Sequence, residues 1–188
     1  MISLKTDITL DAKGLACPMP IVKTKKAMQD LEEGQVLMIL ATDKGSKADL
    51  KAWAGSSGHQ YLGTIEDGDV LKHYLRKSSS EETIERKYPN VSSNGELEQK
   101  LEEGNIVVLD VREAAEYVFH HIPNAISIPL GELEDRLNEL NKEDEIYVVC
   151  RTGSRSDFAA QNLADNGFTN VVNVVPGMSE WSGKTENM

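Results

Sequence analysis

The chain has 188 residues, of which 39% are hydrophobic and 5% aromatic, and its formal net charge is −11. This composition is typical of a globular protein, and the length allows one large domain or two small ones. Such acidity disfavours broad nucleic-acid binding, which requires Lys and Arg to neutralise phosphates. No apolar run approaches the roughly 20 residues of a membrane helix, and the first seven residues do not resemble a secretory signal. We expect a cytoplasmic protein with neither a nucleic-acid nor a membrane partner.

The chain has two cysteines, Cys17 and Cys150. Two cysteines cannot form a dense secreted disulfide framework, so we expect two reduced thiols. The cysteines are distant in sequence and the four histidines are scattered, so the spacing of a metal site is missing. We therefore expect no metal and no other cofactor.

A polar, serine-rich stretch over residues 76–93 divides the chain into halves of different character. Residues 1–75 carry a net charge of −1, whereas residues 91–188 carry −11. Two domains fit this asymmetry better than one. The predicted organisation is a first domain at 1–76, a linker at 77–91 and a second domain at 92–188.

The first domain is predicted to have the order β-α-β-α-β-β. We expect strands over residues 8–10, 36–41, 59–65 and 70–75, and helices over 20–33 and 46–54. Ser46 is a plausible N-cap of the second helix, and Asp67-Gly68 predicts a hairpin turn. Helices packed on one face of a small sheet would give a two-layer α/β sandwich.

The second domain alternates strands with helices. We expect strands over residues 106–110, 125–128, 145–150 and 170–174, and helices over 96–103, 113–119, 130–140 and 154–166. Asn94 is a possible cap of the first of these helices. The pattern predicts an α/β domain with a central parallel sheet and helices on both faces. Ligands of such sheets bind at the carboxyl ends of strands, and Cys150 ends a strand.

The segment around Cys150 predicts an anion-binding loop. An apolar strand ends in the cysteine, a short loop containing Gly153 follows, and then a helix begins. The backbone N–H groups of residues 151–155 can point inward, and the helix N-terminus and the charges of Arg151 and Arg155 add positive potential. The first anion this setting favours is the Cys150 thiolate, a nucleophile. The alternative is that Cys150 is a buried strand-end residue and Arg151 lies on the surface.

Four segments over about residues 92–183 make the second half resemble the rhodanese family of sulfurtransferases. They are Asp110-Val-Arg-Glu113, His121-Ile-Pro-Asn-Ala125, Cys150-Arg-Thr-Gly-Ser-Arg155 and Gly177-Met-Ser-Glu-Trp181. The resemblance implies that Cys150 carries a persulfide. It also implies substrate binding by the loop residues Arg151, Thr152, Gly153, Ser154 and Arg155. Asp110 and Arg112 would brace the loop or pocket.

A Cdc25-type phosphatase or arsenate reductase is the competing function on this scaffold. Those enzymes resemble rhodaneses but have five residues between the cysteine and the arginine, whereas four separate Cys150 from Arg155. The shorter loop suits a sulfane sulfur better than a phosphoryl group, and it supplies no Asp as general acid. His120 or His121 could assist Cys150, but we interpret His121 as a structural residue of its turn.

Cys17 directly precedes a predicted helix. Pro18 and Pro20 can start that helix without losing a needed N–H. The helix dipole and the nearby Lys23 and Lys26 would favour a Cys17 thiolate. The sequence is not Cys-x-x-Cys, which excludes a thioredoxin-like dithiol at this position.

Residues 6–76 resemble the TusA family of small sulfur-carrier proteins, also called SirA-like. The match consists of Gly14-Leu-x-Cys17-Pro18-x-Pro20 and of Asp43, Ser46, Asp49 and Trp53 before His59. The resemblance implies that Cys17 accepts a persulfide and hands it to a partner. The alternative is that Cys17 merely caps a helix.

Together the two halves predict a sulfurtransferase. Cys150 would take sulfane sulfur from thiosulfate or a low-molecular-weight persulfide, and Cys17 would receive it for delivery to a thiol or a sulfur-acceptor protein. A hypothesis of another class is a redox-sensing or protein-binding module that uses a Cys17–Cys150 disulfide.

Overall fold

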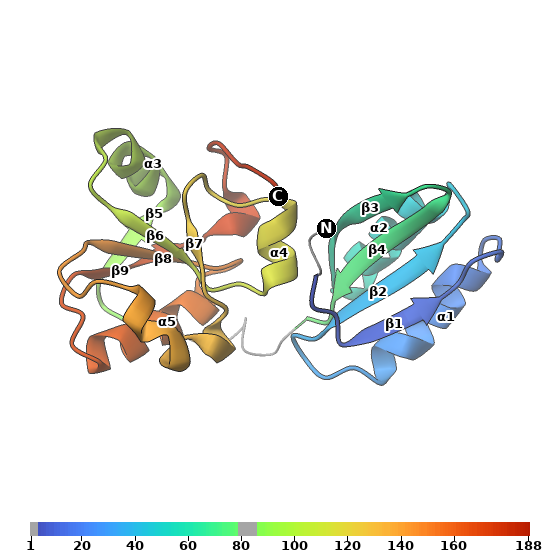
Figure 1. Cartoon of the computed structure of the whole chain (residues 1–188), viewed down its shortest axis with the longest axis horizontal. Helices are drawn as coiled ribbons and strands as arrows, with labels where there is room; N and C mark the ends of the chain where they lie inside the picture. Colours follow the sequence, from blue (N-terminus) through green and yellow to red (C-terminus); the bar gives the residue numbers. More distant parts are fainter. Residues whose placement is uncertain (1–3, 79–85) are drawn as a thin grey trace. The chain divides into compact units, whose positions relative to one another are not determined.

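The first unit, residues 1–79, is a four-stranded sheet with two helices (Figure 1). The structure is a computed structural model that describes residues 4–78 and 86–188. The strands are β1 (Ile8–Asp11), β2 (Val36–Ala41), β3 (Gln60–Asp67) and β4 (Val70–Arg76), and the helices are α1 (Met19–Gln29) and α2 (Ser46–Ser57). The strand order is β1-β2-β4-β3, in which β1 and β2 are parallel and the other pairs antiparallel. Both helices cover one face, so the predicted two-layer sandwich is confirmed.

The parallel pairing of β1 and β2 brings the two helix-entry loops together. Because both strands end at the same edge of the sheet, the loop after β1 and the loop after β2 begin side by side. The backbone N–H of Gly14 donates to Thr42 Oγ1 at 2.9 Å and joins the two loops. The loop that carries Cys17 is thereby fixed beside the start of α2.

The start of α2 differs from the prediction, because Gly45 and not Ser46 is the N-cap. The Ser46 hydroxyl donates instead to the Asp43 carbonyl oxygen at 2.5 Å and lies 2.9 Å from Nε2 of His73. An N-cap side chain would bond to the helix's own N–H groups. Here Ser46 is buried and its hydroxyl is turned back toward the sheet.

His73 on β4 is completely buried within this polar network. Its Nδ1 atom lies 2.9 Å from both the Tyr61 hydroxyl and Thr64 Oγ1. Burial lowers the pKa of His73 to about 4, so the ring is neutral near pH 7. A neutral His73 links β3 to the turn that begins α2.

The second unit, residues 80–188, is a five-stranded parallel sheet with the order β5-β9-β8-β6-β7. The strands are β5 (Val91–Ser93), β6 (Val107–Asp110), β7 (Ile126–Ser127), β8 (Ile146–Val149) and β9 (Val171–Val175). The α-helices are α3 (Asn94–Glu103), α4 (Ala114–Phe119) and α5 (Ser154–Asp165), and the 3-10 helices are η2 (Leu130–Glu132), η3 (Glu134–Glu139) and η4 (Met178–Glu180).

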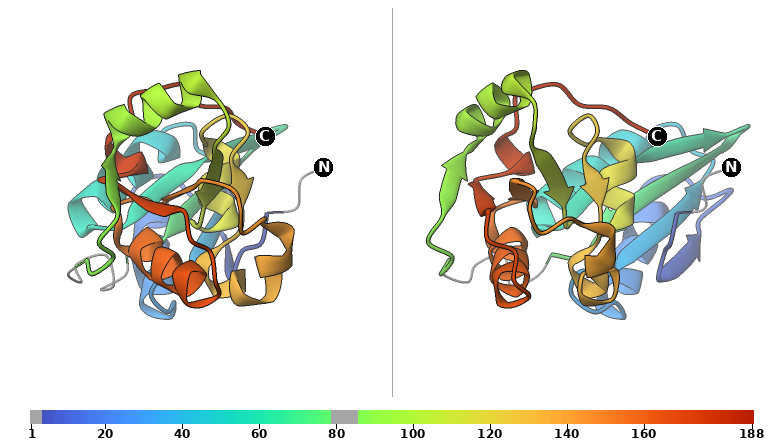
Figure 2. Two further views of the ribbon diagram at one scale, coloured as in Figure 1. Left: turned by 90° about the vertical axis from the view of Figure 1, so that its left-hand side faces the viewer. Right: turned by 60° about the vertical axis from the view of Figure 1, so that its left-hand side comes forward.

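Two separate apolar clusters show that helices cover both faces of this sheet. One cluster joins Leu109 and Val148 to Leu163 of α5, and the other joins Tyr147 to Leu97 of α3. Figure 2 shows α3 and α5 on opposite sides of the strands. The predicted parallel α/β fold is therefore confirmed. No helix of the described residues is long and apolar enough to cross a membrane.

Two segments of the second unit differ from the predicted elements. The expected helix over residues 130–140 consists of two 3-10 helices, because apolar residues three or four apart fit i→i+3 bonding as well as i→i+4 bonding. Residues 86–91, which we expected in the linker, bond to the second unit. The N–H groups of Lys87 and Tyr88 donate to Asp157 Oδ1 at 3.0 and 2.8 Å.

The burial of His73 predicts a pH-dependent stability. An unfolded histidine has a pKa near 6.5, so protonation of the unfolded chain removes stability as pH falls from 6.5 toward 4. Between about pH 7 and pH 4.5 this loss should be about 2–3 kcal/mol. The free energy of unfolding can be measured with urea through Trp53 fluorescence in a Trp181→Phe background. Between pH 7 and pH 4.5 it should fall by about 2–3 kcal/mol less in the His73→Gln variant than in the protein that keeps His73. Equal pH dependence with and without His73 would contradict the assignment.

Candidate active site

Cys150 follows β8, the central strand of the second sheet. Residues 146–149 are all buried, and the side chain of Cys150 is 1% exposed. The thiol therefore lies at the middle of the carboxyl edge, where parallel α/β sheets bind their ligands.

The loop after Cys150 directs hydrogen-bond donors at its sulfur. Gly153 has φ of +92°, which favours glycine, and its backbone N–H donates to Cys150 Sγ at 3.1 Å. The hydroxyl oxygen of Ser156 lies 3.3 Å from the same sulfur. The helix α5 begins at Ser154, so its positive end faces the loop. Sequence reasoning foresaw the loop amides but missed Ser156, which lies inside the helix.

A second loop holds the backbone of the first. The N–H groups of Met178 and Ser179 donate to the carbonyl oxygens of Cys150 and Arg151 at 2.8 and 2.9 Å. A Cβ on Gly177 would lie 2.5 Å from the Cys150 carbonyl oxygen, closer than real Cβ contacts. Only glycine allows this approach, which accounts for the glycine of the late motif.

Two asparagines complete this support, and sequence reasoning assigned neither to the site. Asn94 accepts from the Gly177 N–H at 3.0 Å and donates to the Gly177 carbonyl oxygen at 2.9 Å. We expected Asn94 to cap α3, but Ser93 is the cap and forms a capping box with Glu96. The fully buried Asn173 of β9 donates to the Gly153 carbonyl oxygen at 3.1 Å. Each amide fixes one of the two loops.

Arg155 forms a buried bidentate ion pair. Its Nη1 and Nη2 atoms donate to the two carboxylate oxygens of Glu116 on α4, at 2.8 and 3.0 Å. Both side chains are at most 5% exposed. The pair ties α4 to the first turn of α5, and the predicted substrate contact of Arg155 stays a prediction.

Asp110 and Arg112 form a second buried pair at the end of β6. The Arg112 guanidinium bonds both carboxylate oxygens of Asp110, with Nη2–Oδ2 at 2.6 Å. It also donates to the His120 carbonyl oxygen at 2.8 Å. This geometry suits the predicted bracing role, because it holds the segment after β6 without exposing either charge.

The remaining loop residues differ in exposure. Ser154 is buried and Arg151 is half-buried. The hydroxyl oxygen of Thr152 is buried and has no hydrogen-bond partner among the described residues. Arg86 also reaches this loop, since its Nη1 would be 3.1 Å from a Cβ on Gly153. Sequence reasoning placed Arg86 in the linker and missed this approach.

Cys17 is an exposed free thiol directly before α1. Pro18 is the N-cap and Pro20 lies in the first turn, as the proline pattern predicts. The charged neighbours are not those we expected. The carboxylates of Asp49 and Asp43 raise the pKa of Cys17, chiefly through a hydrogen bond from the thiol to Asp49. The net shift of the Cys17 pKa is therefore opposite to the lowering that we expected from the helix dipole, Lys23 and Lys26.

The comparisons with known proteins match each of the two units to a family. Residues 8–77 match the family model "Sulfurtransferase TusA", and residues 93–184 match "Rhodanese-like domain". YrkF of Bacillus subtilis (strain 168), named a "putative sulfur carrier protein", is 54% identical over 189 residues, covering 97% of this chain and 100% of YrkF. YrkI of the same organism is 60% identical over 74 residues, covering 39% of this chain and 99% of YrkI.

A solved structure supports the second unit. The rhodanese-like domain protein from Staphylococcus aureus is 35% identical, with a TM-score of 0.50, and the match covers 53% of this chain and 99% of that one. Fold, thiol sites and relatives define a sulfur-transfer protein. The chain belongs to the family in which a TusA-type sulfur-carrier domain is joined to a single rhodanese domain.

The contact at Gly177 predicts a loss of activity without a loss of fold. In Gly177→Ala the new Cβ must displace the Cys150 carbonyl and tolerate φ of +94°. Such displacement should reduce sulfurtransferase activity, measured as sulfane-sulfur transfer to cyanide, by about 10- to 100-fold. Gly131→Ala is the matched control, because nothing lies within 4 Å of its Cβ. Full activity in Gly177→Ala would refute the proposed support of the loop.

The Arg155–Glu116 pair predicts a large effect on stability. Glu116→Gln removes the negative charge of this buried pair, which should lower the free energy of unfolding by about 3–5 kcal/mol. The control is Glu132→Gln, which breaks an exposed pair with Arg136 and should cost less than about 1 kcal/mol. Urea unfolding followed through Trp181, in a Trp53→Phe background, measures both. Similar losses in the two variants would argue against a special role for the buried pair.

Proposed function

We propose that the protein takes sulfane sulfur from thiosulfate or a small persulfide onto Cys150 and relays it to Cys17. The observation that carries the step at Cys150 is the pair of groups within hydrogen-bond distance of its Sγ, the Gly153 N–H and the Ser156 hydroxyl, which donates to the sulfur when it is a thiolate. Both stabilise negative charge on sulfur at the start of a helix. The relay to Cys17 is supported by the families of the two units, a sulfur-carrier family and a rhodanese-like family.

In the first step the Cys150 thiolate attacks the outer sulfur of thiosulfate. A new S–S bond forms to Cys150, the S–S bond of thiosulfate breaks, and sulfite leaves with the electron pair. The product is the Cys150 persulfide, and the total charge is unchanged. We assign persulfide binding to the loop of residues 151–155, and the bracing of that loop to Asp110 and Arg112, whose buried pair supports this role.

Before the second step the Cys150 persulfide takes up a proton from water. The Cys17 thiolate then attacks its outer sulfur. The Cys150–S bond breaks, Cys150 leaves as a thiolate, and Cys17 carries the persulfide. Gly153 and Ser156 stabilise Cys150 as the leaving group, as they did when it was the nucleophile. Tethering makes the transfer effectively intramolecular. Cys17 then delivers sulfur to a thiol or an acceptor protein, in the cytoplasm, where thiols stay reduced.

Peptide mass spectrometry after incubation with thiosulfate tests this order. The unmodified protein should gain sulfur on both cysteines, Cys17→Ser on Cys150 alone, and Cys150→Ser on neither. Cyanide-dependent thiocyanate formation should vanish in Cys150→Ser and persist in Cys17→Ser. Equal loading of Cys17 in Cys150→Ser would overturn the relay.

The same samples distinguish the redox alternative. After mild peroxide, non-reducing peptide mapping would show a specific Cys17–Cys150 disulfide if the protein were a redox sensor. A sensor of that kind would show this disulfide without any uptake of sulfur from thiosulfate. Sulfur uptake without the disulfide favours the relay.

A further inference from the structure

The two thiols share a backbone setting but differ in their charged neighbours. Each precedes the N-terminus of a helix, α5 for Cys150 and α1 for Cys17. The exposed guanidinium of Arg86 approaches the loop of Cys150. The charged groups that act on Cys17 are instead the carboxylates of Asp49 and Asp43, to which the relay gives no role.

Asp43 and Asp49 bring these carboxylates together on one side of Cys17. A Cβ on Gly45 would lie 3.6 Å from Asp43 Oδ2 and 3.9 Å from Asp49 Oδ2, so both side chains converge over that glycine. Asp49 and Asp43 both act on the Cys17 thiol, because their carboxylates raise its pKa. Within the described residues neither aspartate forms an ion pair with Lys or Arg.

The position of the carboxylates is fixed by the fold. The bond from Gly14 to Thr42 holds the Cys17 loop beside Asp43. The bonds from buried His73 to Ser46, and from Ser46 to the Asp43 carbonyl, hold the turn that begins α2. The backbone that carries Asp43 is therefore held next to the loop that carries Cys17.

Fixed charges beside an exposed thiol discriminate among its reaction partners. A unit charge a few ångströms from a reacting anion changes the encounter rate by about fivefold at low salt, and a dianion is affected more strongly. We propose that Asp43 and Asp49 select the sulfur donor of Cys17 by charge. They exclude small anionic donors such as thiosulfate and admit a protein-bound persulfide whose charge is balanced by neighbouring cations.

This inference rests on the proposed role of Cys17 as a sulfur acceptor and adds a residue-level mechanism. In the transfer, the Cys17 thiol proton moves to the Asp49 carboxylate. The thiolate then attacks the outer persulfide sulfur, and the donor thiolate leaves with the electron pair. We assign this proton to Asp49 because, of the two carboxylates, Asp49 has the larger effect on the pKa of the thiol.

Alkylation of Cys17 by two reagents of different charge tests the selection directly. In the Cys150→Ser background Cys17 is the lone thiol, and the rates with anionic iodoacetate and neutral iodoacetamide are compared. Both reagents attack the same thiolate, so their rate ratio cancels any change in its pKa. At an ionic strength of about 10 mM, the iodoacetate/iodoacetamide ratio should rise about three- to fivefold for each aspartate changed to Asn.

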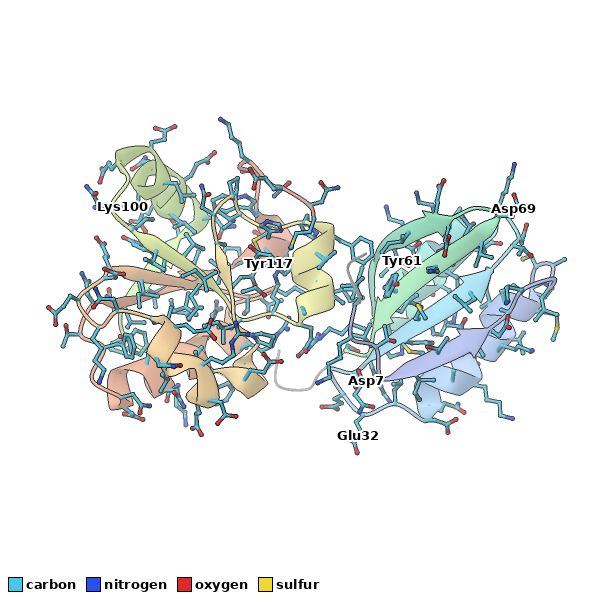
Figure 3. The ribbon with its side chains drawn as sticks, in the orientation of Figure 1. Asp7, Glu32, Tyr61, Asp69, Lys100 and Tyr117 are labelled. Atoms are coloured by element: carbon cyan, nitrogen blue, oxygen red, sulfur yellow. The ribbon has the colours of Figure 1, made fainter. Side chains whose placement is uncertain are left out.

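The matched control removes equal charge at the other end of the same unit. Asp30→Asn with Glu32→Gln changes two exposed carboxylates beyond the end of α1, where Figure 3 shows Glu32 far from the hairpin end marked by Asp69. This control should leave the ratio within about twofold. An equal rise in the control, or no rise in Asp43→Asn with Asp49→Asn, would overturn the proposal.

If the aspartate variants do not fold, the selection can still be tested by a measurement that leaves both aspartates unchanged. In Cys150→Ser itself, raising the ionic strength to about 0.5 M should screen the carboxylates and raise the ratio. A ratio that is flat or falls with salt contradicts the selection.

A thiosulfate assay separates this inference from the relay. Thiosulfate should leave Cys17 unmodified in Cys150→Ser and should load it when both aspartates are changed to Asn in that background. Loading of Cys17 before the aspartates are changed would refute the selection. Failure of the unmodified protein to pass sulfur from Cys150 to Cys17 would refute the relay, while the alkylation ratio would still decide on the selection.

Discussion

The position of Cys150 depends on a close contact between two backbone segments. The carbonyl of Cys150 can accept from the Met178 N–H only because Gly177 has no Cβ, which would lie 2.5 Å from the carbonyl oxygen. This contact fixes the carbonyl on one side of the loop, and Gly153 then presents its N–H to the sulfur on the other. A backbone donor costs no reorganisation during the reaction, because its position is already set by the fold.

The buried charges of the second unit follow from the same requirement. Arg155 forms a buried ion pair with Glu116, and Arg112 forms one with Asp110. Buried pairs of this kind add little net stability, but removing one partner is costly. Their contribution is geometric, because each pair fixes a segment at the carboxyl edge of the sheet, where Cys150 lies.

The sequence predicted both sheets and the position of each thiol, because those depend on local apolar patterns and on turn residues. It did not predict the partners that lie far away along the chain. Asn94 and Gly177 are 83 residues apart, and Asn173 is 20 residues from Gly153. Asn94 looked like a helix cap because local propensity favours that role. Only the tertiary structure shows that its amide bonds Gly177 instead.

Cys17 shows why a helix N-terminus alone does not define a reactive thiolate. The dipole acts on Cys17 through α1, but the parallel pairing of β1 and β2 brings the acidic turn of the next helix to the same edge. Asp49 then opposes the dipole from a neighbouring element that sequence proximity could not reveal. A thiol kept protonated until a donor arrives suits a carrier, because it limits oxidation and side reactions of the exposed sulfur. The acidic setting is thus compatible with a sulfur acceptor that reacts when a matching surface supplies the compensating charge.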